Sequence, residues 1–325
     1  MKRTRSELRW NPILEEWVAI ATHRQNRPQM PENYCPFCPG SGKVPDDYNV
    51  YIYPNDFPTF SLSSPKPENR RPNLYKVKKS VGVCDVVLYH PDHLMTLADM
   101  EIPRIVELIG LWSMRFQKLG EREEIKYVFI FENKGDVIGV TMPHPHGQIY
   151  AFPYIPPVIE RELKSAKGYV KRKPNCLFCD ILNEEKREGK RKIVENRSFF
   201  AFIPFFARYP YEVHIMSKNH VLTLLDFSEN MIEDFAHILK IVLQKYDNLF
   251  GFSFPYMMVM HQAPTDGKDY SFYHFHVEFY PPYRSREKLK YLAGCEMGAG
   301  TFINDTLPEE RAQELREISI RSDGS

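Results

Sequence analysis

The chain has 325 residues, of which 43% are hydrophobic and 26% charged, a composition that excludes a disordered chain and a coiled coil and is typical of about two globular domains. Its 43 lysines and arginines balance 42 aspartates and glutamates, so no broad positive field attracts nucleic acid or an anionic membrane. Apolar runs such as 128–131 and 256–260 are far shorter than the roughly 20 residues that span a bilayer. No apolar stretch follows the basic N-terminus, as one would in a secretory signal, and we therefore expect a cytoplasmic protein.

Two stretches have apolar residues at helical spacing, and several short β-rich runs surround them. The predicted helices cover 100–119, with Ile105, Leu108 and Trp112 on one face, and 228–249, with Phe235 and Ile238. The predicted strands cover 51–53, 86–89, 127–131, 148–152, 199–203, 213–216, 256–260 and 275–280. One long helix for several strands is not the regular alternation of a doubly wound parallel sheet, so the predicted fold class is α+β with mostly antiparallel sheets.

Six sequence elements recur in the same order in the two halves of the chain. The first half reads CPFC at 35–38, YIYPNDFPTF at 51–60, DHLMTL at 92–97, the first helix, YVFIFENKG at 127–135 and HPH at 144–146. The second half reads CLFC at 176–179, AFIPFFARYP at 201–210, NHVLTL at 219–224, the second helix, FPYMMVMHQAP at 254–264 and HFH at 274–276. We infer an internal duplication with domains at 1–163 and 164–325, joined by the basic, proline-containing stretch 164–174.

The two CxxC pairs predict metal sites. In a reducing compartment such a pair is half of a zinc site or a redox motif, and Pro39-Gly40 after the first pair disfavours the helix that a redox motif requires. The histidines that recur in the repeat complete two Cys2His2 sets, which suit a closed, structural Zn²⁺ site. These sets are Cys35, Cys38, His93 and His144, and Cys176, Cys179, His220 and His274. His90 is an alternative to His93, although only His93 matches the repeat.

The segment 141–148 places a second histidine beside the first metal set. If the segment is extended, His144, His146 and Gln148 project to one side. A neutral imidazole at His146 can attack phosphorus and form a covalent phosphoramidate, and Gln148 can donate its amide N–H to a phosphoryl oxygen. Positive or donor groups for phosphate are present at 24–27, 54–57 and 133–135, although each pattern is also common at an ordinary surface or turn.

These motifs together resemble the galactose-1-phosphate uridylyltransferase family of the histidine-triad superfamily, over nearly the whole chain. The resemblance is carried by HRQNRP, YNVYIYPNDFP, YHPDHLMTL, FENKG, HPHGQIYA, KYDNLFGFSFPY and FHVEFYPPYRS. It implies two tandem histidine-triad-like repeats, a homodimer, zinc on the first Cys2His2 set, and ping-pong transfer of UMP from UDP-glucose to galactose-1-phosphate. His146 would carry the uridylyl group and Gln148 would stabilise the intermediate. Contacts to the nucleotide or its phosphates would come from Arg24, Arg27, Asn55, Asp56, Phe57, Asn133 and Thr141, and contacts to the hexose from Lys290 and Glu296.

The sequence departs from the family pattern at two places. Some members hold a second metal with a glutamate and three histidines, which would fall on Glu162, His261, His274 and His276, and His274 is then claimed by both sets. We favour the set with Cys176 and Cys179, because thiolates bind zinc strongly.

The second departure concerns the substrate. A glutamine expected near Phe302 is absent, as in the branch that includes ADP-glucose phosphorylases. One alternative is therefore adenylyl transfer to phosphate. Another is hydrolysis of a nucleotide conjugate, because water can resolve the same covalent intermediate. A zinc-containing nucleic-acid-binding module is disfavoured by the near-neutral charge.

Overall fold

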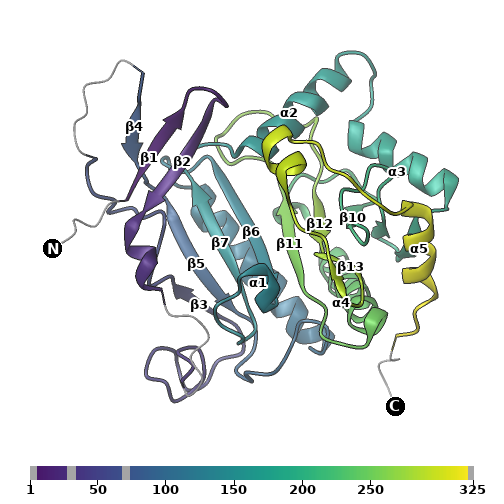
Figure 1. Ribbon diagram of the computed structural model, residues 1–325, viewed down its shortest axis with the longest axis horizontal. Helices are drawn as coiled ribbons and strands as arrows, with labels where there is room; N and C mark the ends of the chain where they lie inside the picture. The colour runs from purple at the N-terminus through teal and green to yellow at the C-terminus, as the bar shows by residue number, and fades with distance from the viewer. Residues whose placement is uncertain (1–5, 28–33, 68–73, 321–325) are drawn as a thin grey trace.

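In a computed structural model, which describes residues 6–27, 34–67 and 74–320, the chain is built around a nine-stranded antiparallel sheet (Figure 1). The order of its strands is β3-β5-β7-β6-β11-β12-β10-β9-β8. Their bounds are β3 (Tyr51–Pro54), β5 (Val83–Leu88), β6 (Tyr127–Lys134), β7 (His146–Phe152), β8 (Lys192–Glu195), β9 (Phe199–Phe202), β10 (Val213–Ser217), β11 (Tyr256–His261) and β12 (His276–Tyr280). The predicted α+β class is confirmed.

The sheet is symmetric about the pair β6 and β11, which joins the two halves of the chain. On one side β7 lies between β6 and β5, and on the other β12 lies between β11 and β10. The junction runs from Tyr256 opposite Lys134 to Met260 opposite Ile130. The repeat inferred from sequence is therefore visible as two equivalent sets of strands, with the HPH and HFH segments at corresponding positions.

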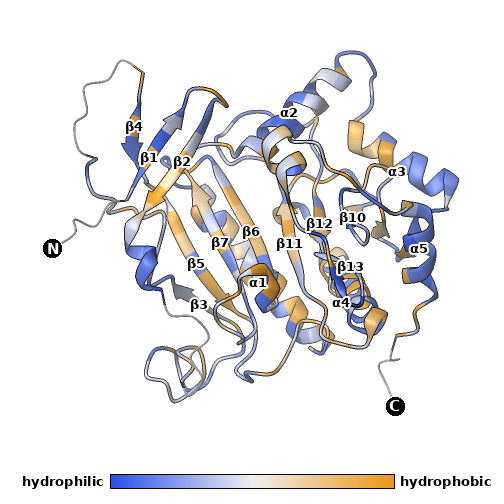
Figure 2. Cartoon of the chain, in the orientation of Figure 1, coloured by the Kyte–Doolittle hydropathy of each residue, from blue (hydrophilic) through white to orange (hydrophobic). Residues whose placement is uncertain are grey.

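Two long helices cover one face of the sheet. These are α1 (Ile102–Gly120) and α4 (Glu229–Phe250), which contact each other. Helix α4 begins after Ser228, whose side chain accepts a hydrogen bond from the N–H of Met231, and ends at Gly251 with φ of 72°. The predicted faces are correct, since Trp112 and Phe235 are fully buried against the sheet. Figure 2 shows the matching hydrophobic colour along β5, β6 and β11.

On the opposite face, α2 (Pro157–Val170) and α3 (Leu177–Glu188) cover the second half. Their buried residues, among them Leu163 and Phe178, pack with Phe200 and Phe202 of β9. The stretch 164–174, expected to join the halves, is helical as far as Val170. Its lysines occupy the exposed side of a helix whose apolar residues at 159, 163 and 166 are buried.

In the first half, a small sheet packs on this same face, where its Leu8 and Cys84 of β5 belong to one buried cluster. A three-stranded sheet of order β2-β1-β4 contains β1 (Ser6–Asn11), β2 (Glu16–Ala21) and β4 (Val77–Lys79). A hairpin of β13 (Tyr283–Ser285) and β14 (Lys288–Leu289) leads to a short helical turn at Cys295–Ala299 and to α5 (Pro308–Glu317), which contacts β8. Across the described ranges of the chain, no helix combines the length and apolar character required to cross a bilayer.

Candidate functional site

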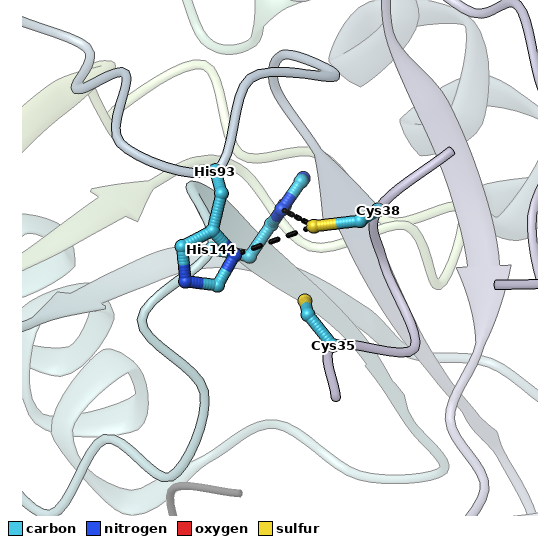
Figure 3. Close-up of side chains that lie close together, drawn as sticks. All are labelled: Cys35, Cys38, His93 and His144. Atoms are coloured by element: carbon cyan, nitrogen blue, oxygen red, sulfur yellow. Dashed lines mark hydrogen bonds between the residues drawn. The ribbon is translucent and has the colours of Figure 1, made fainter. Parts of the chain in front are cut away.

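The first Cys2His2 set is assembled as the repeat predicts. Cys35 and Cys38 lie in the loop before β3, His93 follows β5, and His144 precedes β7, and their side chains converge in Figure 3. The Sγ of Cys38 lies 3.4 Å from Nδ1 of His93 and 3.6 Å from Nδ1 of His144. Tetrahedral zinc bonds of about 2.3 Å to sulfur and 2.1 Å to nitrogen require a separation of roughly 3.6 Å. The four donors therefore fit a zinc ion.

A tyrosine orients the buried ligand of this set. The hydroxyl of Tyr48 lies 2.9 Å from Nε2 of His144 and donates to the carbonyl of Phe37 at 2.8 Å. Nε2 of His144 can therefore donate to Tyr48 while Nδ1 faces the thiol, as expected of a metal ligand. Burial, and next His93, lower the pKa of His144 to about 4, so the ring is neutral. His90 lies outside the set and accepts a hydrogen bond from the N–H of Asp92.

The second Cys2His2 set has the same geometry. The Sγ of Cys179 lies 3.4 Å from Nδ1 of His220 and 3.5 Å from Nδ1 of His274, and Cys176 completes the set. Nε2 of His220 lies 2.9 Å from the carbonyl of Ser271, and Nε2 of His274 lies 2.9 Å from that of Ser217. Both rings can therefore donate from Nε2 and present a lone pair at Nδ1 toward the thiols, which suits a zinc ion.

The alternative set of a glutamate and three histidines does not form with His274. Instead, Glu162 of α2 meets His261 of β11 and His276 and Glu278 of β12. Nδ1 of His261 lies 3.1 Å from the carboxylate of Glu162 and 3.2 Å from Nε2 of His276. His274 is excluded because its Nδ1 faces Cys179 and its Nε2 faces Ser217.

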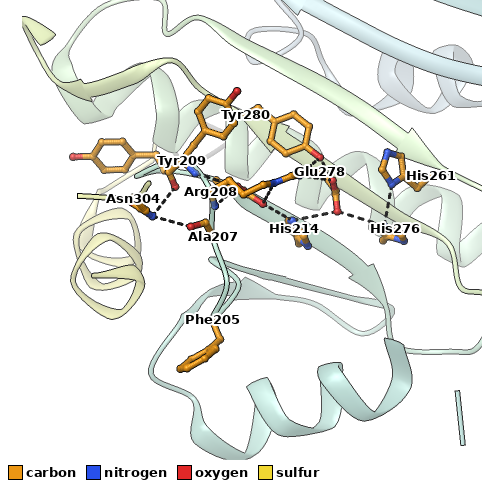
Figure 4. A network of polar contacts seen from close by, with 12 residues as sticks. Phe205, Ala207, Arg208, Tyr209, His214, His261, His276, Glu278, Tyr280 and Asn304 are labelled. Atoms are coloured by element: carbon orange, nitrogen blue, oxygen red, sulfur yellow. Dashed lines mark hydrogen bonds and ion pairs between the residues drawn. The ribbon is translucent and has the colours of Figure 1, made fainter. Parts of the chain in front are cut away.

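This Glu162 group continues into a buried charge network (Figure 4). His214 lies 3.0 Å from Glu212 and 3.4 Å from Glu278, and Arg208 lies 3.3 Å from Glu278. Although burial alone would lower them, the pKa values of His214 and His261 are raised, chiefly by Glu278 and Glu162 respectively. The carboxylates thus have cationic partners within the protein, although the four donors also lie close enough to hold a metal ion.

His146 lies at the start of β7 and lines a cavity on the sheet face opposite α1 and α4. Its Nδ1 lies 2.8 Å from the carbonyl of His144. With Nδ1 as donor, Nε2 retains the lone pair and is the nitrogen available for nucleophilic attack. The side chain is 9% exposed, and burial lowers its pKa, which keeps the imidazole neutral. The ring of Phe37, from the first CxxC loop, lies 5.7 Å from the His146 ring and limits its movement.

The cavity collects most of the residues expected to contact a nucleotide. Its lining includes Arg27, Asn55, Asp56, Phe57, Thr141 and Gln148 with His146, and also Pro36, Phe37, Tyr53, Val86 and Met142. The buried hydroxyl of Thr141 has no hydrogen-bond partner in the described structure. Burial, and next Arg24, lower the pKa of Arg27, so the two guanidinium groups lie near each other. Neither forms an ion pair with a carboxylate among the described residues, which leaves positive charge beside His146 for an anion.

Four expected contacts lie elsewhere. Arg24 is bound next to the cavity and donates to the carbonyl of Phe57 at 2.8 Å. Asn133 lies on β6, opposite Met257 of β11, and is not part of the lining. Lys290 and Glu296 are 3.5 Å apart, with Lys290 near the ring of Tyr209 in the second half. Within one chain they do not border the cavity at His146.

Comparison with known proteins assigns the family. The model of the galactose-1-phosphate uridyl transferase N-terminal domain matches residues 1–156, and that of the C-terminal domain matches residues 162–323. The chain belongs to this family. A galactose-1-phosphate uridylyltransferase of Thermotoga maritima is 43% identical over 316 residues, which cover 97% of this chain and 99% of the relative.

Solved structures of the family share the fold. A structure described as a uridylyltransferase has a TM-score of 0.88 and 35% identity, covering 95% of this chain and 97% of its own. An ADP-glucose phosphorylase from Arabidopsis thaliana, solved with ADP-glucose, has a TM-score of 0.76 and 25% identity, covering 98% and 100%. Identity is therefore higher to the uridylyltransferase.

Sequence reasoning missed the groups that orient the ligands. Tyr48 and Ser217 carry no motif, and their positions beside His144 and His274 arise from the fold. Glu278 occupies in the second half the position of Gln148 in the first, two residues after a histidine, and this pattern gives no signal of its contacts with Glu162, His261 and His276. Phe37 could have been found, because it lies between the two cysteines of the first pair.

Proposed function

We propose that the chain is a nucleotidyltransferase that moves a uridylyl group from UDP-glucose to galactose-1-phosphate through a covalent bond to His146. The observation that supports this most is the state of His146 in the cavity: neutral, with Nδ1 next to a backbone carbonyl and Nε2 free. The 43% identity to a curated enzyme of that name agrees with it.

The first half-reaction is attack on phosphorus. Nε2 of His146 attacks the α-phosphorus of UDP-glucose, a bond from nitrogen to phosphorus forms, and the bond to the oxygen of glucose-1-phosphate breaks. Arg27 places positive charge beside the phosphates, and the Gln148 amide can donate to the phosphoryl oxygen where negative charge grows. Asn55, Asp56 and Phe57, at the turn after β3, would hold the nucleotide.

The second half-reaction returns the enzyme to its starting state. A phosphate oxygen of galactose-1-phosphate attacks the phosphorus of the uridylyl group, and the nitrogen–phosphorus bond breaks to release UDP-galactose. His146 recovers its neutral imidazole. Splitting the transfer in this way lets one nucleophile serve two substrates in turn.

We further propose that both Cys2His2 sets hold zinc in a structural role. Bound zinc would tie the CPFC loop to the residue two places before His146, and so help to fix the start of β7. The donor distances of 3.4–3.6 Å and the orienting carbonyls and hydroxyl support this assignment. A reducing compartment such as the cytoplasm would keep these thiols available for metal.

A homodimer is the assembly that we propose. Lys290 and Glu296 lie outside the cavity lining of their own chain, so hexose contacts from these residues require a second copy. The segment that carries them exposes Tyr291 and Met297, which suits a protein contact.

Donor profiling tests the proposed function. The metal-loaded enzyme is incubated separately with radiolabelled UDP-glucose and ADP-glucose, then chased with galactose-1-phosphate, phosphate or water. We expect uridylyl label on the wild type, none on His146→Ala, and release by galactose-1-phosphate. Label from ADP-glucose released by phosphate would instead favour the phosphorylase activity of the Arabidopsis relative, and release by water alone would favour a hydrolase.

A further inference from the structure

A buried carboxylate lies on β6, the strand that pairs with the strand carrying His146. Glu132 of β6 is on the helix-covered face of the sheet, with 6% of its surface exposed. Its Oε1 accepts a hydrogen bond of 2.9 Å from the hydroxyl of Tyr256. Its Oε2 is buried and has no hydrogen-bond partner in the described parts of the chain. A carboxyl group is costly in such a place unless it is neutral or bonded, and the proposed reaction does not use it.

Tyr89 connects this carboxylate to the nucleophile strand. The buried hydroxyl of Tyr89 makes no hydrogen bond of acceptable distance and angle with the described residues. Tyr89 is nevertheless close enough to Glu132 to shift the pKa of that carboxyl group. The same hydroxyl lies only 2.0 Å from the position that a Cβ on Gly147 would occupy, so it touches the backbone of that glycine. The N–H of Tyr89 donates to the carbonyl of Pro145 at 3.1 Å. One residue therefore contacts the chain on both sides of His146.

We propose that Glu132 is a positioning residue for His146 and acts through Tyr89 on the backbone at Gly147. The inference rests on the proposed function, since it concerns the attack by His146. The ring of Tyr89 is held from one side by Trp112, at 5.8 Å between ring centroids, and from the other by Glu132. Loss of the carboxyl group would let the ring of Tyr89 move, and the first residues of β7 would move with it. A displacement well below 1 Å changes the approach of Nε2 to phosphorus.

The neutral form of Glu132 suits this role. A carboxylic acid can donate from Oε2 to the oxygen of Tyr89 while Oε1 accepts from Tyr256, so that each oxygen has a partner. The titratable groups that face it are Tyr89 after β5, Tyr256 on β11, Lys134 on β6 and Asp247 on α4. Lys134 is paired with Asp247 at 2.9 Å, which reduces its effect. Burial raises the pKa of Glu132 to about 7.

The test compares variants that differ only in this network. Glu132→Gln keeps the shape and a neutral donor, whereas Glu132→Leu removes both hydrogen-bonding groups. Tyr89→Phe and Tyr256→Phe each remove one hydroxyl next to the same carboxyl group, but only Tyr89 touches the strand of His146. For each folded, metal-loaded variant, the rate of uridylyl-enzyme formation from UDP-glucose is measured in a single turnover, together with kcat and KM.

We expect Glu132→Leu to lower the labelling rate and kcat about tenfold, with KM for UDP-glucose changed less than about twofold. The labelling rate of Glu132→Gln should stay within about threefold of that of the wild type. The Tyr89→Phe variant should form the uridylyl-enzyme more slowly than the Tyr256→Phe variant. Equal labelling rates for Glu132→Leu and the wild type, or equal effects of the two tyrosine variants, would overturn the inference while leaving the proposed function intact. A wild type that forms no uridylyl adduct would overturn both.

Discussion

Glu132→Gln gives a pH-dependent change in stability whose size follows from the burial of this side chain. In the folded protein the pKa of Glu132 is raised from 4.5 to about 7, mainly by burial. Between these two values the unfolded chain releases the proton and the folded chain keeps it, so the unfolded state is favoured progressively as pH rises. Each pH unit costs about 1.4 kcal/mol. The total penalty reaches about 3 kcal/mol near pH 7 and stays constant above it.

Glutamine cannot ionise, so the stability of the variant does not fall with pH for this reason. We expect the free energy of unfolding of Glu132→Gln, relative to wild type, to be about 2–3 kcal/mol more favourable at pH 8 than at pH 5. Urea unfolding of both proteins with zinc present at each pH measures the difference, and effects of pH on metal binding cancel in the comparison. Glu287→Gln, in the exposed turn between β13 and β14, is the matched control and should show no such difference.

A relative stability of Glu132→Gln that is the same at both pH values would refute the reasoning. It would mean that Glu132 is ionised in the folded protein across this range, held by Tyr89, Tyr256 and Lys134 more strongly than burial opposes it. The neutral-acid interpretation of its contact with Tyr89 would then be wrong as well.

Three further predictions concern the proposed site. Cys35→Ser should lose one zinc of two by elemental analysis and at least about 3 kcal/mol of unfolding free energy, because a structural ion contributes its binding energy to folding; full metal content and stability would contradict the assignment. His146→Ala should abolish transfer with zinc content and melting temperature unchanged; loss of zinc would mean that His146, and not His144, is the ligand. Gly147→Ala should cost about 1–3 kcal/mol by urea unfolding, since its Cβ would meet the hydroxyl of Tyr89; Gly298→Ala, which has open space around it, is the control, and equal stability of the two variants would exclude the close contact.

The repeat made much of this structure predictable from sequence. Six recurring elements matched each cysteine pair with the histidines that lie beside it in the structure, and the helical periodicity identified α1 and α4 to within two residues. Alternation along an extended chain also placed His146 and Gln148 on one side of β7, where both line the cavity. These features depend on neighbouring residues or occur in both halves of the chain, so a prediction made for one half is supported by the same pattern in the other.

Contacts between distant segments were not predictable in this way. Glu132 and Tyr256 are 124 residues apart and meet only because β6 pairs with β11 across the junction of the halves. Lysines dominate the composition of 164–174 and predict a linker there, although the apolar residues at 159, 163 and 166 have the spacing of helix α2. His274 is not part of the Glu162 group because its Nε2 lies within hydrogen-bond distance of the carbonyl of Ser217.

In the proposed reaction only His146, of the two equivalent histidines His146 and His276, is the nucleophile, and helix α2 accounts for the difference. His146 and His276 begin equivalent strands, both have Nδ1 near the carbonyl two residues earlier, at 2.8 and 2.9 Å, and both lie beside the phenylalanine of a CxxC pair. In the second half, however, α2 brings Glu162 onto this face, where Tyr273 donates to it at 2.6 Å. His276 is only 1% exposed and faces carboxylates, so a phosphate would meet negative charge there. The same imidazole geometry therefore supports attack on phosphorus in one half and a buried ionic network in the other.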